Sequence, residues 1–390
     1  MIEIKRKLFH NKRKIIIPVW VVAGICAIII PVSYNIKPDN PSARQLAYIS
    51  ALTVMPEGLI HEAEKTGRNI LAVLQSNNQS SDIRQKDSNF NDSDTENILH
   101  ETPADILKSI NRTVGLFDSG KYIYDGEILE KTFTDYQATD SFENIHIKNT
   151  TESKEVDIES VLEHSFSLPV DDLSKPVVLI YHTHTTETYV MADNGKFSSS
   201  YSERSDDKSV NMIRVGEEIA RVLEANGIGV IHDKTVYDEV YTGAYKKSRA
   251  SIEKILEKNP SIIITLDIHR DAIHYDSTTR IKQTTQIQTA KAAQMMIITG
   301  AEDGNITDFP DWETNLEFAV RLQKAVNDKY SNLMKPILFC CRKYNMDITP
   351  YSLLIEVGTD MNTLKEAAYS GRLLADVLSA FIKEYTEAKK

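Results

Sequence analysis

The chain has 390 residues, with 45 Lys and Arg against 56 Asp and Glu, and a net charge of −11. Residues 1–14 carry six of the basic residues and one Glu, so the remainder carries 39 − 55 = −16. Proteins that bind nucleic acid gather Lys and Arg on the binding face, so this acidic body argues against a nucleic-acid partner. The three cysteines are Cys26 and the neighbours Cys340 and Cys341, which excludes a disulfide framework and a cysteine-ligated zinc finger.

An uncharged segment of 19 residues, 15–33, follows the basic N-terminus. As a helix at about 1.5 Å per residue it would be roughly 28 Å long, close to the hydrocarbon thickness of a bilayer. The basic residues before it place the N-terminus in the cytoplasm and the rest of the chain outside. A cleaved signal peptide is the alternative, but Val32-Ser33-Tyr34 offers no small-x-small cleavage site. We therefore predict a cytoplasmic segment, 1–14, and a single uncleaved transmembrane helix, 15–33.

The composition changes three times beyond this anchor. Apolar residues recur at helical spacing in residues 34–75, whereas residues 76–102 are rich in Asn, Ser, Asp and Gln and predict a disordered linker. Short alternating runs in residues 103–175 predict a small β-rich lead-in. From residue 176 to 390, strands alternate with helices, which is typical of an α/β fold with a mostly parallel sheet and helices on both faces. The predicted strands are 177–183, 228–232, 261–268, 294–299, 336–341 and 352–357, and the predicted helices are 208–226, 244–259, 312–332 and 362–385, the last with Asn362 as its N-cap.

Two histidines and a carboxylate follow the first strand of this last domain. His182, His184 and Glu187 come directly after the apolar run 177–180. Ligands and chemistry gather at strand ends in α/β sheets. Because the histidines are two residues apart, we expect both to leave the same face of the strand. A lone histidine at a strand end is usually only a polar residue, but two imidazoles with a carboxylate are typical of a zinc site.

Two more predicted strands end in similar residues. His269 follows five mostly β-branched apolar residues; the alternative is a polar cap in which Arg270 and Asp271 form an ion pair. Glu356 lies inside the apolar run 353–358, and burial raises a carboxyl pKa toward the range useful for a general base. A buried structural carboxylate paired with Lys or Arg is the alternative. Together the three strand ends offer what a His/Glu/His zinc site with a separate catalytic carboxylate requires.

These motifs resemble the stage II sporulation protein P family, which is similar to zinc-dependent N-acetylmuramoyl-L-alanine amidases. The order of anchor, spacer and C-terminal catalytic domain also matches. The resemblance implies a fold like that of zinc amidases and phosphorylase/hydrolase enzymes, and a membrane-anchored enzyme that degrades septal peptidoglycan during engulfment in sporulation. It also implies cutting of peptide cross-links, and as partners a lytic transglycosylase and a membrane scaffold. The motifs are His182-Thr-His-Thr-Thr-Glu187, Asp267-Ile-His-Arg-Asp271 and Leu354-Ile-Glu-Val-Gly358.

The resemblance also implies roles for single residues. In the wider amidases the glutamate ligand lies at the start of the first helix, where this chain has Asp206 and Asp207. Glu203 and Asp207 are therefore alternatives to Glu187. Met346 stands where a polar residue such as Gln is expected, so a substrate contact there is expected to differ. The positions that match are the Zn²⁺ ligands His184 and His269 and the general base Glu356. Glu187 is our choice for the third ligand, and His182 and Arg270 are accessory candidates for stabilising the oxyanion.

Two other functions fit the same sequence. One is a different zinc hydrolase of envelope polymers, such as a polysaccharide deacetylase, which product analysis would distinguish. The other is a non-catalytic membrane scaffold, which has no reason to hold stoichiometric zinc.

The basic residues before segment 15–33 generate a prediction about topology. A reporter fused after Lys390 should be active only outside the cytoplasm, because the positive charges hold the N-terminus inside. Activity of the reporter inside the cell, or a mature chain that starts near Ser33, would contradict an uncleaved anchor.

Overall fold

The computed structural model describes residues 98–386, which belong to the compact unit Pro56–Lys390. The predicted cytoplasmic segment, transmembrane helix and helical segment 34–75 lie outside the described residues, as does most of the predicted linker 76–102. Among the helices of residues 98–386, none is both long enough and apolar enough to span a membrane.

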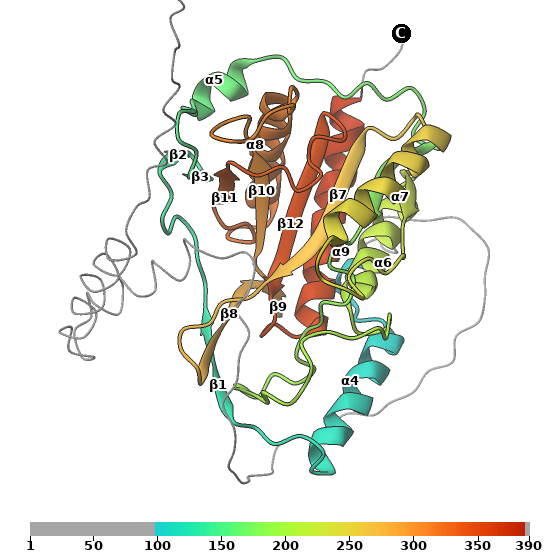
Figure 1. Cartoon of the computed structure of the whole chain (residues 1–390), viewed down its shortest axis with the longest axis vertical. Coiled ribbons are helices and arrows are strands. Elements are labelled where there is room, and N and C mark those ends of the chain that lie inside the picture. Colours follow the sequence, from blue (N-terminus) through green and yellow to red (C-terminus); the bar gives the residue numbers. More distant parts are fainter. Residues whose placement is uncertain (1–97, 387–390) are drawn as a thin grey trace, which may run out of the picture. The chain divides into compact units, whose positions relative to one another are not determined.

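Twelve strands are arranged in two sheets in the described part (Figure 1). The strands are β1 (Gly126–Lys131), β2 (Asp140–Phe142), β3 (Ile145–Asn149), β4 (Pro176–Tyr181), β5 (Lys196–Phe197), β6 (Gly229–His232), β7 (Ile264–Asp271), β8 (Thr279–Ile287), β9 (Ala290–Ala293), β10 (Met295–Gly300), β11 (Ile337–Cys340) and β12 (Tyr351–Thr359). The central sheet has the order β2-β3-β11-β10-β12-β7-β4-β6, and the smaller sheet has the order β5-β1-β8-β9. Strands of the predicted lead-in join both sheets, because β3 pairs with β11 and β1 pairs with β8.

Both sheets are mixed, which corrects the prediction of a mostly parallel sheet. In the central sheet β12, β7, β4 and β6 are parallel to one another, but β10 is antiparallel to β12. The smaller sheet has antiparallel pairs on both sides of its parallel β1–β8 pair. The physical reason in the central sheet is the connection 341–350, which joins β11 to β12 without a helix. A parallel return needs a longer crossover, so β12 runs back against β10.

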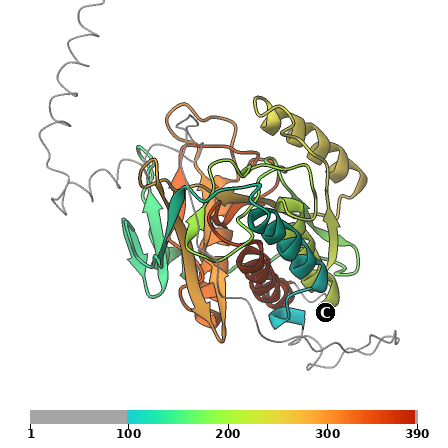
Figure 2. The ribbon, with the colours of Figure 1, turned by 90° about the horizontal axis from the view of Figure 1, so that it is seen from below.

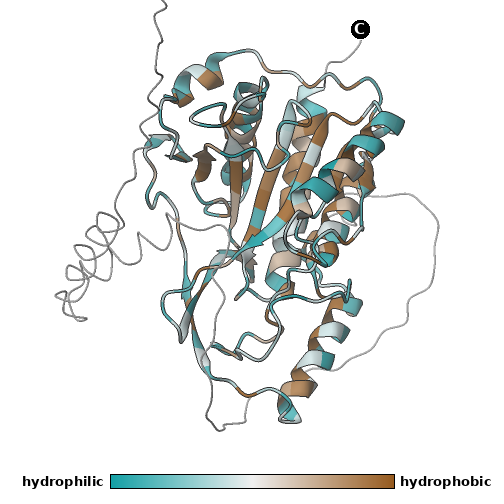
Figure 3. Ribbon diagram, viewed as in Figure 1, coloured by the Kyte–Doolittle hydropathy of each residue, from teal (hydrophilic) through white to brown (hydrophobic). Residues whose placement is uncertain are grey.

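Helices cover both faces of the central sheet, as the strand–helix alternation predicted (Figures 1 and 2). They are α4 (Ala104–Asp118), α5 (Ile158–Glu163), α6 (Met212–Ala225), α7 (Ala244–Lys258), α8 (Trp312–Lys329) and α9 (Leu364–Tyr385). The main core joins the sheet to α6, α8 and α9, while Ile252 of α7 packs against Leu179 and Tyr181 on the other face. Apolar residues run along β10, β12 and β7 and give way to hydrophilic ones toward β8 (Figure 3).

Helix α9 begins two residues after the predicted N-cap. The N-cap is Thr363, whose hydroxyl accepts from the Glu366 N–H while the Glu366 carboxylate accepts from the Thr363 N–H. This reciprocal capping box satisfies two unpaired donors at once. Asn362 instead accepts a hydrogen bond from the Thr359 N–H (2.8 Å) and so fixes the turn after β12.

A buried ionic network ties α6 to α9. The Glu218 carboxylate of α6 accepts from Arg214, Arg221 and Arg372, each at 2.8 Å, and the Glu218 and Arg372 side chains are each only 1% exposed. Arg372 of α9 also donates to the Leu99 carbonyl (2.7 Å). The network therefore holds the first described residues, near Leu99, against α9.

Glu218→Gln should destabilise the fold by about 3 kcal/mol or more, because it leaves the Arg372 guanidinium buried without a counter-charge. Urea unfolding followed by circular dichroism measures the effect. The control is Glu217→Gln, which removes a half-exposed carboxylate paired with Lys234 and should cost at most about 1 kcal/mol. Equal stabilities for the two variants would show that the network does not hold α6 and α9 together.

Candidate active site

The two predicted histidines of the loop after β4, His182 and His184, contact different parts of the structure. His184 stacks on the ring of Tyr241, with centroids 4.6 Å apart and planes at 3°, and meets the His269 ring edge-on at 5.2 Å. His182 lies elsewhere, fully buried among other groups. The expectation that both leave one face is wrong, because β4 ends at Tyr181 and the two-residue alternation ends with it.

His182 contacts the ends of β7 and β6 through its two ring nitrogens. Its Nδ1 lies 2.9 Å from the Ile268 carbonyl, and its Nε2 lies 2.9 Å from Nε2 of His232. A carbonyl only accepts hydrogen bonds, so Nδ1 of His182 carries the proton. Nε2 of a neutral His182 then accepts, and His232 donates. Both ring nitrogens of His182 are engaged, which makes it a support for the end of β7.

Glu187 and His269 face each other, with Glu187 Oε2 3.7 Å from His269 Nδ1. On the far side of the ring, His269 Nε2 lies 2.9 Å from Oδ1 of the buried Asp267. Asp267 is held in turn by the Thr183 N–H (2.8 Å) and hydroxyl (2.6 Å). The sequence motif had not singled out Asp267 as a site residue. Its signal was the spacing Asp-x-His on a strand, which places both side chains on one face.

Glu356 lies next to His269 across the sheet. β12 and β7 are parallel neighbours, and Glu356 is the register partner of His269. The Glu356 side chain is buried, and its Oε2 has no hydrogen-bond partner. Burial raises the pKa of Glu356 to about 8, helped by Asp271 and Glu187 and opposed by His269. A buried carboxyl group whose pKa lies near neutral pH suits proton transfer.

The two imidazoles titrate in opposite directions. Burial lowers the pKa of His184 to about 3, and His269 and Arg204 add to the effect. Burial alone would lower the pKa of His269 as well, but Asp267 and Glu187 raise it to about 9. At neutral pH and without a cation, His184 is therefore neutral and a ready ligand, while His269 is protonated between the carboxylates of Asp267 and Glu187.

The other candidates lie around this centre. Arg270 donates to the carbonyls of Thr188 (2.8 Å) and Glu203 (3.0 Å), so its guanidinium braces the loop that carries Glu187. The Glu203 carboxylate pairs with Arg280. Asp207, the second alternative ligand, pairs with Arg112 near the surface (2.6 Å). Of the three acidic candidates, Glu187 is the one that lies beside His269.

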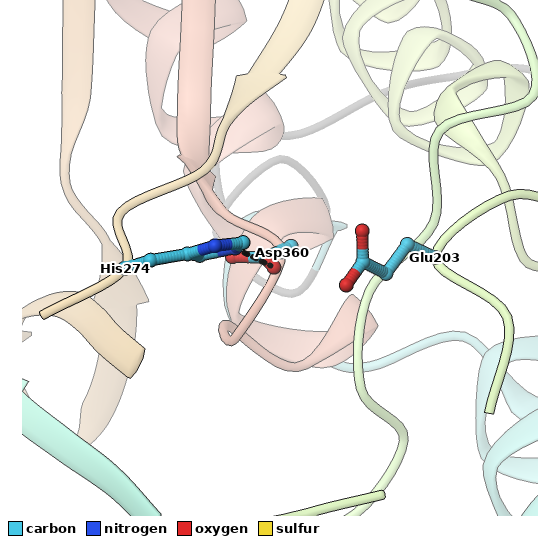
Figure 4. A group of neighbouring side chains, drawn as sticks. All are labelled: Glu203, His274 and Asp360. Carbon is cyan, nitrogen blue, oxygen red and sulfur yellow. Dashed lines mark ion pairs between the residues drawn. The ribbon is translucent and has the colours of Figure 1, made fainter. Parts of the chain in front are cut away.

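A second group, Glu203, His274 and Asp360, has ligand atoms that all lie within 4.8 Å of one another (Figure 4). In this group His274 Nε2 lies 3.6 Å from Asp360 Oδ2. The Arg280 guanidinium contacts both Glu203 and Asp360, the latter at 3.0 Å. This guanidinium already supplies the positive charge between the two carboxylates. The group therefore acts as an ionic staple between the loop 198–205 and the turn after β12.

The predicted zinc set fits a metal in its chemistry. His184 Nδ1 and Glu356 Oε2 are buried and lack hydrogen-bond partners, which is costly unless a ligand or cation uses them. Two imidazoles and a carboxylate form the ligand set of many catalytic zinc sites, and a carboxylate behind a ligating His is their usual support. Within residues 98–386 the ligand atoms of His184, Glu187 and His269 do not all lie within 4.8 Å of one another, so they must draw together around an ion.

Comparison with known proteins identifies the family. Residues 61–379 match the family Stage II sporulation protein P (SpoIIP). The chain belongs to the SpoIIP family, and the prediction from the motifs is confirmed. A relative from Bacillus subtilis (strain 168), named Stage II sporulation protein P, is 29% identical over 228 residues. The match covers 55% of this chain and 53% of the relative, so it spans about half the length of that SpoIIP protein.

Two solved amidase structures are similar at a low level. The N-acetylmuramyl-L-alanine amidase Ami1 from Mycobacterium smegmatis is 9% identical, with 55% of this chain and 100% of that chain covered and a TM-score of 0.33. The CwlD amidase from Clostridioides difficile, solved with the GerS lipoprotein, is 13% identical, with 54% and 98% covered and a TM-score of 0.32.

The close approach of α6 to the His182–His232 pair generates a test. A Cβ at Gly216 would lie 2.5 Å from Nε2 of both imidazoles, so Gly216→Ala should separate them and cost about 1–3 kcal/mol. The control is Gly115→Ala in α4, where nothing lies within 4 Å and the better helix former should add about 0.5–1 kcal/mol. Thermal unfolding compares the two. A Gly216→Ala protein as stable as the parent would mean that the imidazole pair is not held rigidly.

Proposed function

We propose that this SpoIIP-family protein is a membrane-anchored, zinc-dependent N-acetylmuramoyl-L-alanine amidase that acts on septal peptidoglycan during engulfment in sporulation. The observation that carries the proposal is the convergence of His184, Glu187 and His269 beside the buried, unpartnered Glu356. Family membership supports the sporulation setting and peptidoglycan as substrate. The basic and apolar residues of segment 1–33 support an extracytoplasmic location, and family membership supports the space between the two septal membranes. Cutting of peptide cross-links, and a lytic transglycosylase and a membrane scaffold as partners, remain part of the proposal.

The chain's own residues divide the proposed hydrolysis between them. A zinc ion held by His184, Glu187 and His269 would polarise the scissile carbonyl and lower the pKa of a water from about 15.7 toward about 7. Oε2 of Glu356 accepts the proton of the attacking water as oxygen adds to the lactyl carbonyl carbon. Glu356 then delivers that proton to the L-alanine nitrogen as the C–N bond breaks, which yields a carboxylic acid and an amine. Asp267, whose carboxylate lies 2.9 Å from Nε2 of His269, fixes the ring so that Nδ1 faces Glu187.

Substitution of Glu356 and His269 separates the general base from the ligands. Glu356→Gln should keep zinc and lower hydrolysis by about 10²–10⁴-fold or more, since the amide cannot accept the proton. His269→Ala should lose most of the zinc. Metal analysis of the purified proteins and mass spectrometry of digested muropeptides measure the two effects, with Glu217→Gln as the control.

Three outcomes of that experiment would contradict the residue roles, and two more would contradict the proposed activity. Loss of zinc in Glu356→Gln would make Glu356 a ligand, and near-normal activity would make it a structural carboxylate. Full zinc occupancy in His269→Ala would remove His269 from the site. Release of acetate instead of a peptide headed by L-alanine would identify a deacetylase, and a parent protein without stoichiometric zinc or activity would identify a scaffold.

A further inference from the structure

An open groove lies beside the proposed catalytic centre, between the start of α7 and the connection 341–350. Tyr245 belongs to both the groove and the centre. Its ring lies 5.6 Å from that of His184 and 6.3 Å from that of His269, and on the groove side it lies 5.2 Å from that of Tyr344. The groove therefore adjoins the centre, and the Tyr245 ring forms part of both. The lining residues are Tyr245, Arg249, Lys343, Tyr344, Asn345 and Asp347.

The side of the groove formed by the connection 341–350 has a strained backbone. Tyr344 and Asn345 have φ angles of 43° and 59°, two consecutive left-handed residues that are not glycine. Each costs on the order of 1–2 kcal/mol, and strain of this kind gathers at functional sites. The Asn345 side chain compensates by donating to the Tyr245 carbonyl (3.1 Å) and the Ser248 hydroxyl (3.0 Å) of α7. The conformation presents the Tyr344 ring against Tyr245.

The groove carries more positive than negative charge. Asp347 lies on its floor with a side chain only 6% exposed, and it binds Arg249 at 2.8 Å and Lys343 at 3.2 Å. Asp347 thus orients two cations. Arg249 also binds the exposed Glu253 through Nε (2.9 Å), so Nη2 of Arg249 and the Lys343 ammonium are the donors left for a ligand. The N-cap of α7 is Gly243, which supplies no side-chain acceptor, so the positive end of this helix adds to the field.

We propose that the groove binds the carboxylate-bearing peptide on the amine side of the scissile amide. Arg249 and Lys343 contact its carboxylates, and Tyr245 and Tyr344 pack against its backbone and apolar atoms. The glycan of peptidoglycan is neutral where its acids are amidated or absent, whereas the peptide carries free carboxylates, so cations select the peptide. This inference rests on the proposed function, because it names the part of the substrate that the same centre would release.

Direct binding tests the groove without any need for hydrolysis. The probes are a tetrapeptide headed by L-alanine with two free carboxylates and the same peptide with both carboxylates amidated, each titrated calorimetrically into the full chain. The parent protein should prefer the acid by roughly tenfold, as charge-assisted hydrogen bonds predict. Lys343→Gln should weaken binding of the acid by roughly three- to tenfold and leave the amidated peptide unchanged. Added salt should weaken binding of the acid alone.

Matched variants guard against a loss of fold. Lys343→Gln leaves Arg249 to pair with Asp347, so its thermal unfolding should match that of the parent. Lys254→Gln makes the same charge change at an exposed position farther along α7 and should bind both peptides like the parent. Arg249→Gln should lower the preference for the acid in the same direction as Lys343→Gln.

The outcomes for the groove and for the hydrolase are separable. Preferential binding of the acid without any hydrolysis would support the groove and remove the hydrolase. Hydrolysis by a parent protein that binds acid and amide equally, or a Lys343→Gln protein that keeps the full preference, would overturn the groove and leave the hydrolase. Where hydrolysis is measurable, Lys343→Gln should raise KM for the acid substrate with kcat nearly unchanged, the mark of lost binding that is uniform along the reaction.

Discussion

The parallel pairing of β7 with β12 is the constraint on which the site depends. It makes His269 and Glu356 register partners on neighbouring strands of a buried sheet. Neither residue can move away without shifting a strand that is paired on both sides. The loop after β4 then brings His184 and Glu187 to a position that the sheet has already defined. A rigid element thus positions the proposed proton carrier, and a loop supplies two of the three proposed ligands.

That loop is pinned mainly through backbone atoms and buried polar partners. Thr183 donates twice to Asp267, and His182 donates to the Ile268 carbonyl. In the other direction, Arg270 donates to the Thr188 carbonyl. The contacts from Thr183 and His182 reach the two residues of β7 just before His269. The contact from Arg270 comes from the residue of β7 just after His269. A loop with contacts of this kind holds its side chains nearly as firmly as a strand would.

The sequence predicted the parts of this site that obey a simple period, and missed those that depend on loops. Apolar runs located the strand ends, and burial inside such a run marked Glu356. The parting of His182 from His184 was missed because the alternation of a strand does not continue past its last residue. Asp267 was visible only as an ordinary strand-end polar residue until its contact with His269 was known. The aromatic rings of Tyr241 and Tyr245 come from a segment about sixty residues beyond His184, and no spacing rule connects it to the loop.

The same limit explains why the central sheet was predicted as mostly parallel. Helix–strand alternation correctly implied helices on both faces of the sheet, but alternation says nothing about strand direction where a helix is absent. The short connection 341–350 reverses the chain, makes the sheet mixed and, with Tyr344 and Asn345 in left-handed conformations, forms the wall of the groove. One irregular segment therefore determines both the topology and the surface beside the centre.

The residues that stabilise the fold and the residues of the proposed site lie in different parts of the domain. The large apolar core and the Glu218–Arg372 network lie with α6, α8 and α9. At the strand ends, His184 Nδ1 and Glu356 Oε2 are buried without partners and two residues of the connection are strained. Each unpartnered buried atom costs about 1–3 kcal/mol, and a domain with a net stability of about 5–15 kcal/mol tolerates few of them. Under the proposed function, a bound cation and substrate would supply the partners that His184 Nδ1 and Glu356 Oε2 lack.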